Sequence, residues 1–156
     1  MKINEKRILR ELLEDGRKNI SDIAEELDIS RQTVSKKIKE MEKEGTIRSF
    51  TVRINEGDLG LRTKAYIILD IVPSSELRHK FVQEAKKMKN ISQIHHTFGR
   101  FDMVIEVLVK GDDELDRILD RIRDFDAVEE TETLICKYTE KNDPVDPFRL
   151  ILEDEI

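Results

Sequence analysis

One stretch of the sequence, residues 21–45, constrains the fold more than any other. It reads SDIAEELDISRQTVSKKIKEMEKEG, and its apolar residues recur at the spacing of two short helices joined by a turn. Ser21 and Ser30 are placed to cap these helices, and Gly45 is placed to end the second. Ile29 falls in the turn, where we expect it to be buried. This combination is typical of a helix-turn-helix.

The outward face of the second helix is polar and basic. Its apolar stripe is Val34, Ile38 and Met41, and at about 100° per residue the remaining side chains point away from the core. Amides, hydroxyls and cations on such a face suit base edges and phosphates in a DNA major groove. This favours a transcription factor over an ordinary helical hairpin with a solvated face. The residues predicted to bind DNA are Ser30, Arg31, Gln32, Thr33, Ser35, Lys36, Lys37 and Lys39.

The distribution of charge is compatible with a nucleic-acid partner even though the chain is acidic. The formal net charge is −6. Residues 1–57 contain 13 Lys and Arg against 12 Asp and Glu, and residues 58–156 contain 15 against 22. The basic residues of the predicted second helix are therefore local to the surface that would meet phosphates. The acidic second half should keep DNA on one side of the molecule.

Cysteine use and hydropathy indicate a cytoplasmic protein. The single cysteine, Cys136, allows no disulfide within the chain and fits a reducing compartment. The N-terminus reads as an amphipathic helix without the apolar centre of a signal peptide. No apolar run approaches the length that spans a bilayer, so we expect no membrane partner.

The first 54 residues are expected to form a three-helix DNA-binding domain. Asn4 is placed to cap a first helix that ends near Gly16. Residues 47–54 alternate apolar and polar side chains, which predicts a strand or ribbon and hence a winged helix-turn-helix. Residues 55–62 contain two glycines and break this pattern, so we expect them to be the domain linker.

The next segment, residues 63–140, alternates strands and helices in a recognisable order. Strands are expected at residues 65–72, 91–98, 103–109 and 128–138, with helices that begin near Ser74 or Ser75 and at Asp112. The order βαββαβ is the ferredoxin-like pattern. The chain as a whole is thus predicted to be an α+β protein with a helix-turn-helix domain followed by a ferredoxin-like domain.

The predicted strands have apolar side chains on both faces, most clearly in residues 65–72 and 103–109. Two helices can cover only one face of such a sheet, so something else must bury the other. The simplest candidate is the same sheet in a second copy. A lone helix-turn-helix also reads only a half-site, and DNA binding therefore independently predicts a homodimer.

The tail, residues 141–156, contains two prolines followed by apolar residues. A tail without a partner would usually stay polar, so this segment is expected to dock on its own body or on a neighbour. Both alternatives remain open at this point. The apolar residues are Phe148, Leu150, Ile151 and Leu152.

Several segments together resemble the leucine-responsive/AsnC ("feast/famine") family of bacterial and archaeal transcriptional regulators. They are ISDIAEELDISRQTVSKKIKEMEKEGTI, GDLGL, GRFD and VEETETLI, and their order and spacing cover roughly residues 3–138. The resemblance implies an N-terminal helix-turn-helix and a C-terminal effector and dimerisation domain. It also implies dimers that often assemble into octamers and a response to amino acids.

The chain departs from the family pattern at two places. Asp28 occupies the position before the second helix at which the family usually has glycine. Asp tolerates left-handed backbone geometry better than most residues, so we expect the motif to survive. The segment from Asn142 onward extends past the usual family end, and its role in assembly is not given by the resemblance.

The resemblance also implies an effector site in the second domain. Gly99 would let backbone amides approach a ligand carboxylate, and Asp102 would hold an ammonium group. The alternative is that Gly99 and Asp102 only shape a tight hairpin and that the threonines are ordinary strand residues. The residues carried over from the family are Gly99, Arg100, Phe101, Asp102, Thr131 and Thr133.

A metal enzyme is the class that the sequence disfavours most. His95, His96, Asp102 and Cys136 are metal-ligand types. Adjacent strand residues point to opposite faces, so the two histidines cannot easily share an ion, and the second and fourth strands should lie at opposite edges. No nucleophile, zinc or phosphate-loop motif is present. We therefore expect no enzyme activity, no metal and no cofactor.

A second function fits the same fold: an abundant, weakly specific DNA-packaging protein without an effector. A regulator should favour some site by about 10³-fold or more over arbitrary duplexes at the same salt concentration, whereas a packaging protein should not. The sequence does not specify the operator, the sign of regulation or the identity of the effector.

Overall fold

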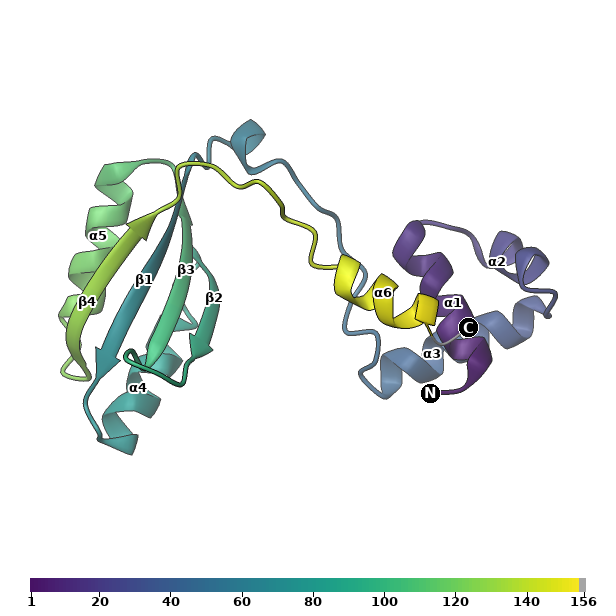
Figure 1. Ribbon diagram of the computed structural model, residues 1–156, viewed down its shortest axis with the longest axis horizontal. Coiled ribbons are helices and arrows are strands. Elements are labelled where there is room, and N and C mark those ends of the chain that lie inside the picture. Colours follow the sequence, from purple (N-terminus) through teal and green to yellow (C-terminus); the bar gives the residue numbers. More distant parts are fainter. Residues whose placement is uncertain (155–156) are drawn as a thin grey trace. The chain divides into compact units, whose positions relative to one another are not determined.

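The protein divides into two compact units, each with its own hydrophobic core (Figure 1). The computed structural model describes residues 1–154. The first unit contains residues 1–53 together with the C-terminal segment from residue 141, and the second contains residues 54–140. The predicted α+β class is confirmed, with a helical unit and a four-stranded sheet unit.

The helix-turn-helix forms from α1 (Ile3–Glu14), α2 (Ile20–Glu26) and α3 (Arg31–Lys43). Their apolar stripes meet in one cluster because each helix repeats its apolar residues every three to four positions. Salt bridges from Lys18 to Glu11 and to Glu26 join α1 to α2. The buried residues of this core are Ile8, Ile23, Ala24, Leu27, Val34 and Met41.

In the helical unit, two of the expected N-caps are wrong, and one is confirmed. The N-cap of α2 is Asn19 rather than Ser21, because the Asn19 side chain accepts the backbone N–H groups of Ser21 and Asp22. The first helix begins one residue before Asn4. Ser30 caps α3 as predicted, by accepting the backbone N–H of Thr33 at 3.1 Å.

The turn between α2 and α3 has left-handed geometry at Asp28, with φ of 52°. An L-residue adopts this region at some steric cost, which is smallest for Asn and Asp among the non-glycine residues. Ile29 is half-buried rather than fully buried, and it packs against the helical core. The helix-turn-helix therefore forms here without the glycine that the family usually has.

The predicted strand at residues 47–54 is wrong, because the chain forms no strand there. It lacks a second strand with which to exchange backbone hydrogen bonds, and alternating apolar residues alone cannot supply one. Phe50, Val52 and Ile54 are exposed. A short 3-10 helix, η1 (Glu56–Leu59), follows and ends at Gly60, whose φ is 77°.

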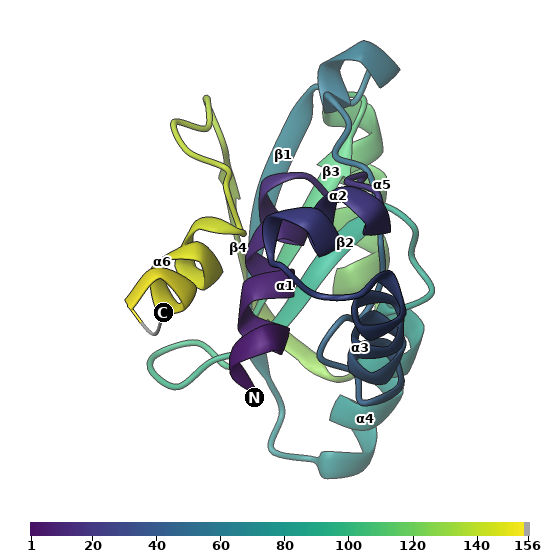
Figure 2. The same ribbon diagram turned by 90° about the vertical axis from the view of Figure 1, so that its right-hand side faces the viewer.

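The second unit has the predicted ferredoxin-like order. It consists of β1 (Thr63–Ile71), α4 (Ser75–Ala85), β2 (Ile91–His96), β3 (Met103–Val109), α5 (Asp112–Arg123) and β4 (Val128–Ile135). The strands lie side by side in the order β2-β3-β1-β4, and all neighbours are antiparallel. Both helices cover the same face of the sheet (Figures 1 and 2).

The boundaries of these elements differ from expectation by a few residues. The last strand ends at Ile135, although Cys136 still donates its backbone N–H to the Lys64 carbonyl. Ser74 caps α4. Asp112 lies inside α5, whose N-cap is Gly111, so its expected capping role is wrong. The Glu114 carboxylate accepts the Lys110 N–H at 2.8 Å instead.

The core of the second unit lies between the sheet and its two helices. Ile67, Leu69 and Ile105 are fully buried there, and Phe81 packs edge-on against Phe125 with ring centroids 5.2 Å apart. Strand residues alternate in direction, so every second side chain points to the other face. No helix of this unit covers that other face (Figure 2). Its side chains on β1 and β3 are Lys64, Tyr66, Ile68, Asp70, Val104, Glu106 and Leu108.

The C-terminal segment docks on its own chain, in the helical unit. Helix α6 (Asp146–Asp154) packs on α1, where Leu152 is buried. The Arg149 guanidinium donates to the Leu13 carbonyl at 3.0 Å and bonds to Asp143 and Asp146 within the segment. Phe148, Leu150 and Ile151, in contrast, remain exposed. Docking therefore uses one stripe of α6.

We predict that Leu152→Ala destabilises the helical unit, whereas Leu150→Ala does not. Leu152 is 5% exposed and Leu150 is 60% exposed. Truncating a buried leucine costs about 2–5 kcal/mol, while an exposed substitution changes stability by roughly 0.5 kcal/mol or less. Hydrogen exchange of the α1 amides against denaturant measures the difference. Equal protection in the two variants would contradict the docking of α6.

Candidate nucleic-acid interface and effector site

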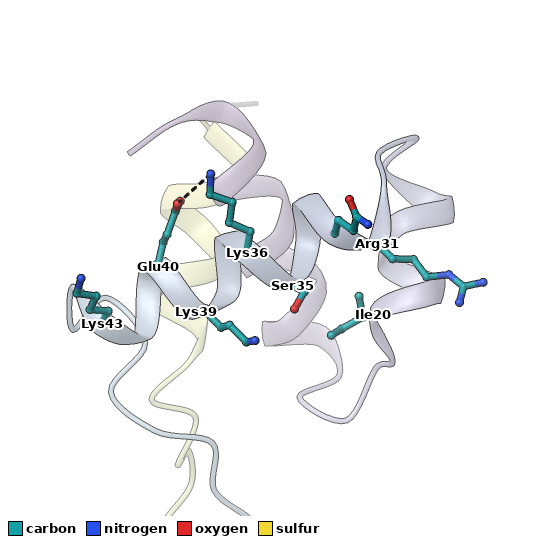
Figure 3. Close-up of a pocket in the computed structure, with 8 residues that line it drawn as sticks. Ile20, Arg31, Ser35, Lys36, Lys39, Glu40 and Lys43 are labelled. Atoms are coloured by element: carbon teal, nitrogen blue, oxygen red, sulfur yellow. Dashed lines mark ion pairs between the residues drawn. The ribbon is translucent and has the colours of Figure 1, made fainter.

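The exposed face of α3 lines an open hollow of about 670 Å³ (Figure 3). Arg31, Gln32, Lys36 and Lys39 are exposed, and Ser35 is half-exposed. Their shared direction follows from the burial of Val34 and Met41 on the opposite side of the helix. The hollow is lined by Ile20, Arg31, Gln32, Ser35, Lys36, Lys39, Glu40 and Lys43.

The predicted residues at the start of α3 serve the helix cap. The Ser30 and Thr33 hydroxyls lie 2.8 Å apart, and Ser30 accepts the Thr33 N–H. Both side chains therefore have a structural role that does not involve DNA. Their expected contacts with DNA remain a prediction.

Lys37, which was also predicted to bind DNA, has structural partners in the helical unit. Its ammonium group lies 3.0 Å from a Glu5 oxygen and 2.8 Å from a Glu40 oxygen, and the side chain is only 19% exposed. Hydrogen bonds to Glu40 and Glu5 raise the pKa of Lys37. At about 100° per residue, Lys37 falls beside the buried residues Val34 and Met41 of α3, so its side chain extends toward α1. Lys37 therefore joins α3 to α1.

Glu40 is a member of this surface that the sequence reasoning missed. It lines the hollow and lies one turn after Lys36, with 3.9 Å between the Lys36 ammonium and a Glu40 oxygen (Figure 3). The hydrogen bond from Lys37 lowers the pKa of Glu40 and favours its charged form. The spacing of four residues from Lys36 was the signal that could have identified it.

The hairpin turn between β2 and β3 is fastened to β1 through Asp102. Its carboxylate accepts the Ile71 N–H at 2.9 Å and lies 3.4 Å from an Arg78 nitrogen, and its own N–H donates to the Leu69 carbonyl. The φ of Gly99 is 141°, a conformation that favours glycine. Asp102 thus has structural partners as well as its predicted role toward a ligand.

The remaining residues of this turn are open to solvent or nearly so. The Arg100 guanidinium lies over the Phe101 ring, 4.9 Å from its centroid. Phe98 is fully exposed. A cation stacked on an aromatic ring at the tip of the hairpin stabilises the turn modestly and leaves both groups near the surface.

Thr131 and Thr133 lie on the face of β4 that the helices cover. They pair with Leu69 and Ile67 of β1, whose side chains are in the core. The Thr131 hydroxyl accepts from the Arg123 side chain at 3.1 Å. The Thr133 hydroxyl is buried without a hydrogen-bond partner among the described residues. Strand β1 separates these threonines from the hairpin turn.

The residues of metal-binding type do not lie close together in the described part of the chain. His95 lies on β2 and bonds to Gln93 at 2.8 Å, whereas Cys136 follows β4 at the opposite edge of the sheet. Among the side chains of residues 1–152 no three His, Cys, Asp or Glu groups lie together in a way that could hold an ion. No helix in the same range is long and apolar enough to span a bilayer.

Comparison with known proteins identifies both units. Residues 1–48 match the family model for winged helix-turn-helix DNA-binding domains, and residues 64–146 match the Lrp/AsnC ligand binding domain. A helix-turn-helix transcriptional regulator of Pyrococcus horikoshii is 31% identical over 141 residues, covering 89% of this chain and 94% of that protein. Another from the same organism is 33% identical, covering 86% and 84%.

Solved structures share the fold at low sequence identity. A regulator from Neisseria meningitidis in complex with L-methionine superposes with a TM-score of 0.87 at 17% identity, covering 97% of this chain and 99% of that one. Escherichia coli AsnC gives 0.83 at 19% identity, covering 92% and 96%. The fold and the two domain matches define a DNA-binding transcriptional regulator. The chain belongs to the Lrp/AsnC family.

Proposed function

We propose that this protein is a sequence-specific regulator that binds DNA as a homodimer through α3 and responds to a small amino acid or related metabolite. The observation that carries the proposal is the exposed face of α3, where four cations and the uncharged polar side chains of Gln32 and Ser35 line one hollow. Cations bind phosphates, whereas Gln and Ser side chains can distinguish base edges.

Within this face we assign different roles to different side chains. Gln32 and Ser35 lie toward base edges, and Arg31, Lys36 and Lys39 mainly meet phosphates. Support comes from the position of Arg31 and Gln32 in the first turn of α3, the part of a recognition helix that enters the groove. Lys36 is 75% exposed and therefore accessible to a phosphate.

We predict that Lys36→Ala weakens binding to every duplex and lowers the salt slope by about one, because one phosphate contact is lost. Lys37→Ala is the matched control, since its ammonium group faces Glu5 and Glu40. It should leave the slope unchanged. Gln32→Ala should instead relax the preference at one base position.

The measurement is fluorescence anisotropy over a salt series with a selected site and with arbitrary duplexes. Wild-type behaviour of Lys36→Ala and Gln32→Ala at every salt concentration would contradict the role of α3. A regulator prefers the selected site by about 10³-fold or more. Nearly equal affinity for all duplexes would instead favour the DNA-packaging alternative.

The effector proposal places the ligand near the turn Gly99–Asp102, with Thr131 and Thr133 completing the site, at a junction between subunits. Support comes from solved relatives of the fold, two of which are complexes with L-methionine. An effector acts only through different affinities for two states, so its coupling to DNA is reciprocal.

We predict that Asp102→Asn weakens amino-acid binding by about tenfold or more, the value of one charge-assisted hydrogen bond. Asn keeps an acceptor for the Ile71 N–H, whereas Asp102→Ala would also release the turn from β1. Calorimetry against amino-acid pools and the thermal stability of the variant are measured together. Unchanged binding in Asp102→Asn, or no amino acid bound at millimolar concentration, would end this assignment.

The uncovered sheet face supports the homodimer. Tyr66, Ile68, Val104 and Leu108 are only half-buried in a single chain. A face of this composition gains free energy when it is covered. The best-supported partner is the same face of a second copy, and we extend this proposal to octamers on the basis of family membership.

We predict that the full chain sediments as a dimer or larger species at micromolar concentration. Ile68→Lys should give a folded monomer, because a lysine ammonium cannot be buried between two sheets without a partner. Leu59→Lys, at an exposed apolar position in η1, is the control and should sediment like wild type. A monomeric wild-type protein would refute the proposal.

A further inference from the structure

The chain passes between its two units twice. It leaves the helical unit after Arg53 and returns to it at Lys141. Two connecting segments result, residues 54–62 before β1 and residues 137–140 after the end of β4. A chain that did not return to the helical unit after β4 would have only the first.

Both connecting segments start from one place in the sheet unit. Strands β1 and β4 are neighbours, with Ala65 paired to Ile135, and the Cys136 N–H extends this pairing by donating to the Lys64 carbonyl at 2.8 Å. The Arg62 N–H donates to the Val109 carbonyl at 3.0 Å. The sheet therefore fixes the ends of both segments on adjacent strands.

Both segments are also held together where they reach the helical unit. The Arg53 guanidinium donates to the Asn142 carbonyl and lies 3.7 Å from an Asp143 oxygen. Asp143 in turn accepts from Arg149 of α6 at 3.2 Å, and Arg149 holds the Leu13 carbonyl at the end of α1. The end of the first segment and the start of α6 thus belong to one hydrogen-bonded cluster.

We propose that the two segments form a double connection that restricts rotation of the DNA-binding unit relative to the effector unit. A single flexible linker allows rotation about many bonds, whereas two segments fixed at both ends lose most of that freedom. The regulatory consequence deepens the proposed function and rests on it. Strand β4, which carries Thr131 and Thr133, continues directly into the second segment. A structural change at the effector site can therefore be transmitted to the DNA-binding unit through the second connecting segment as well as through the first.

The first test does not depend on DNA or on a ligand. Spin labels are placed at Arg17→Cys and Asp116→Cys, both exposed, in a Cys136→Ser background diluted with unlabelled protein. A flexible Gly-Ser insertion after Glu140 should broaden the distance distribution at least twofold. The same insertion after Asp15, with the first label moved from Arg17 to the exposed Glu42 on α3, should leave the distribution narrow. A wild-type distribution as broad as that of the Glu140 insertion would overturn the proposal.

The insertion could broaden the distribution simply by detaching α6 from α1, and a second pair of variants tests for this. Arg53→Ala removes the contact with Asn142 and Asp143, and Arg48→Ala is the control at an exposed arginine of the same segment. Arg53→Ala should broaden the distribution while α1 keeps its hydrogen-exchange protection. Equal distributions for the two variants would overturn the clamp at Arg53.

The regulatory consequence is measured on duplexes with one and with two half-sites. The insertion after Glu140 should reduce the preference for two half-sites by about tenfold. When one DNA-binding unit of a dimer is bound, restricted rotation gives the other unit a higher effective concentration at the second half-site. A normal preference in this variant overturns the consequence for regulation. Failure of the wild-type protein to bind either duplex would instead refute the proposed function, and the distance measurement would still decide the double connection.

Discussion

The sheet unit depends on β1, because this strand is paired along both edges and buried on its helix-covered face. Ala65, Ile67 and Leu69 are completely inaccessible to solvent there. The end of β1 also holds the hairpin turn, through the Leu69 carbonyl and the Ile71 N–H. Strand β1 thus positions segments that are far apart in the sequence, namely β3, β4 and the hairpin turn. A shift of β1 by one residue would turn its buried side chains outward and release the turn at the same time.

The helical unit sets opposing demands on α3. Its inner stripe must pack against α1 and α2, and its outer face must stay open for a partner. Lys37 lies at the boundary between the two faces of α3, and its ammonium group pairs with Glu5 of α1. Glu40 interacts with Lys37 and approaches Lys36, so it belongs to both the packing and the open face. The side chains at this boundary stabilise the helix packing and also modify the local charge.

Periodicity predicted the elements well because it reports which side of each segment is buried. The alternation in residues 63–71 and the three-to-four spacing in α3 are direct consequences of their cores. The same signal failed at residues 47–54, where alternation exists without a neighbouring strand. Hydrogen-bond pairing is a property of two segments, and one segment cannot reveal it.

Side-chain contacts were less predictable than elements because they depend on distant residues and on rotamers. The DNA-binding face follows from helix geometry, but the pairing of Lys37 with Glu5 depends on how α1 packs against α3. The family resemblance implied Asp102 as an effector residue, but its contact with Arg78 joins residues that are 24 positions apart. No local pattern in the sequence contains that information.

The docking of α6 has a consequence for how the helical unit is assembled. The contact between Arg149 and Leu13 spans 136 positions in the sequence, with the whole sheet unit between them. Closing so long a loop in an unfolded chain is entropically costly. Pairing of β1 with β4 shortens the effective loop, because it brings Lys64 next to Cys136 and leaves only residues 13–64 and 136–149 to be closed. Formation of the sheet therefore favours completion of the helical core, because the paired strands shorten the loop that α6 must close.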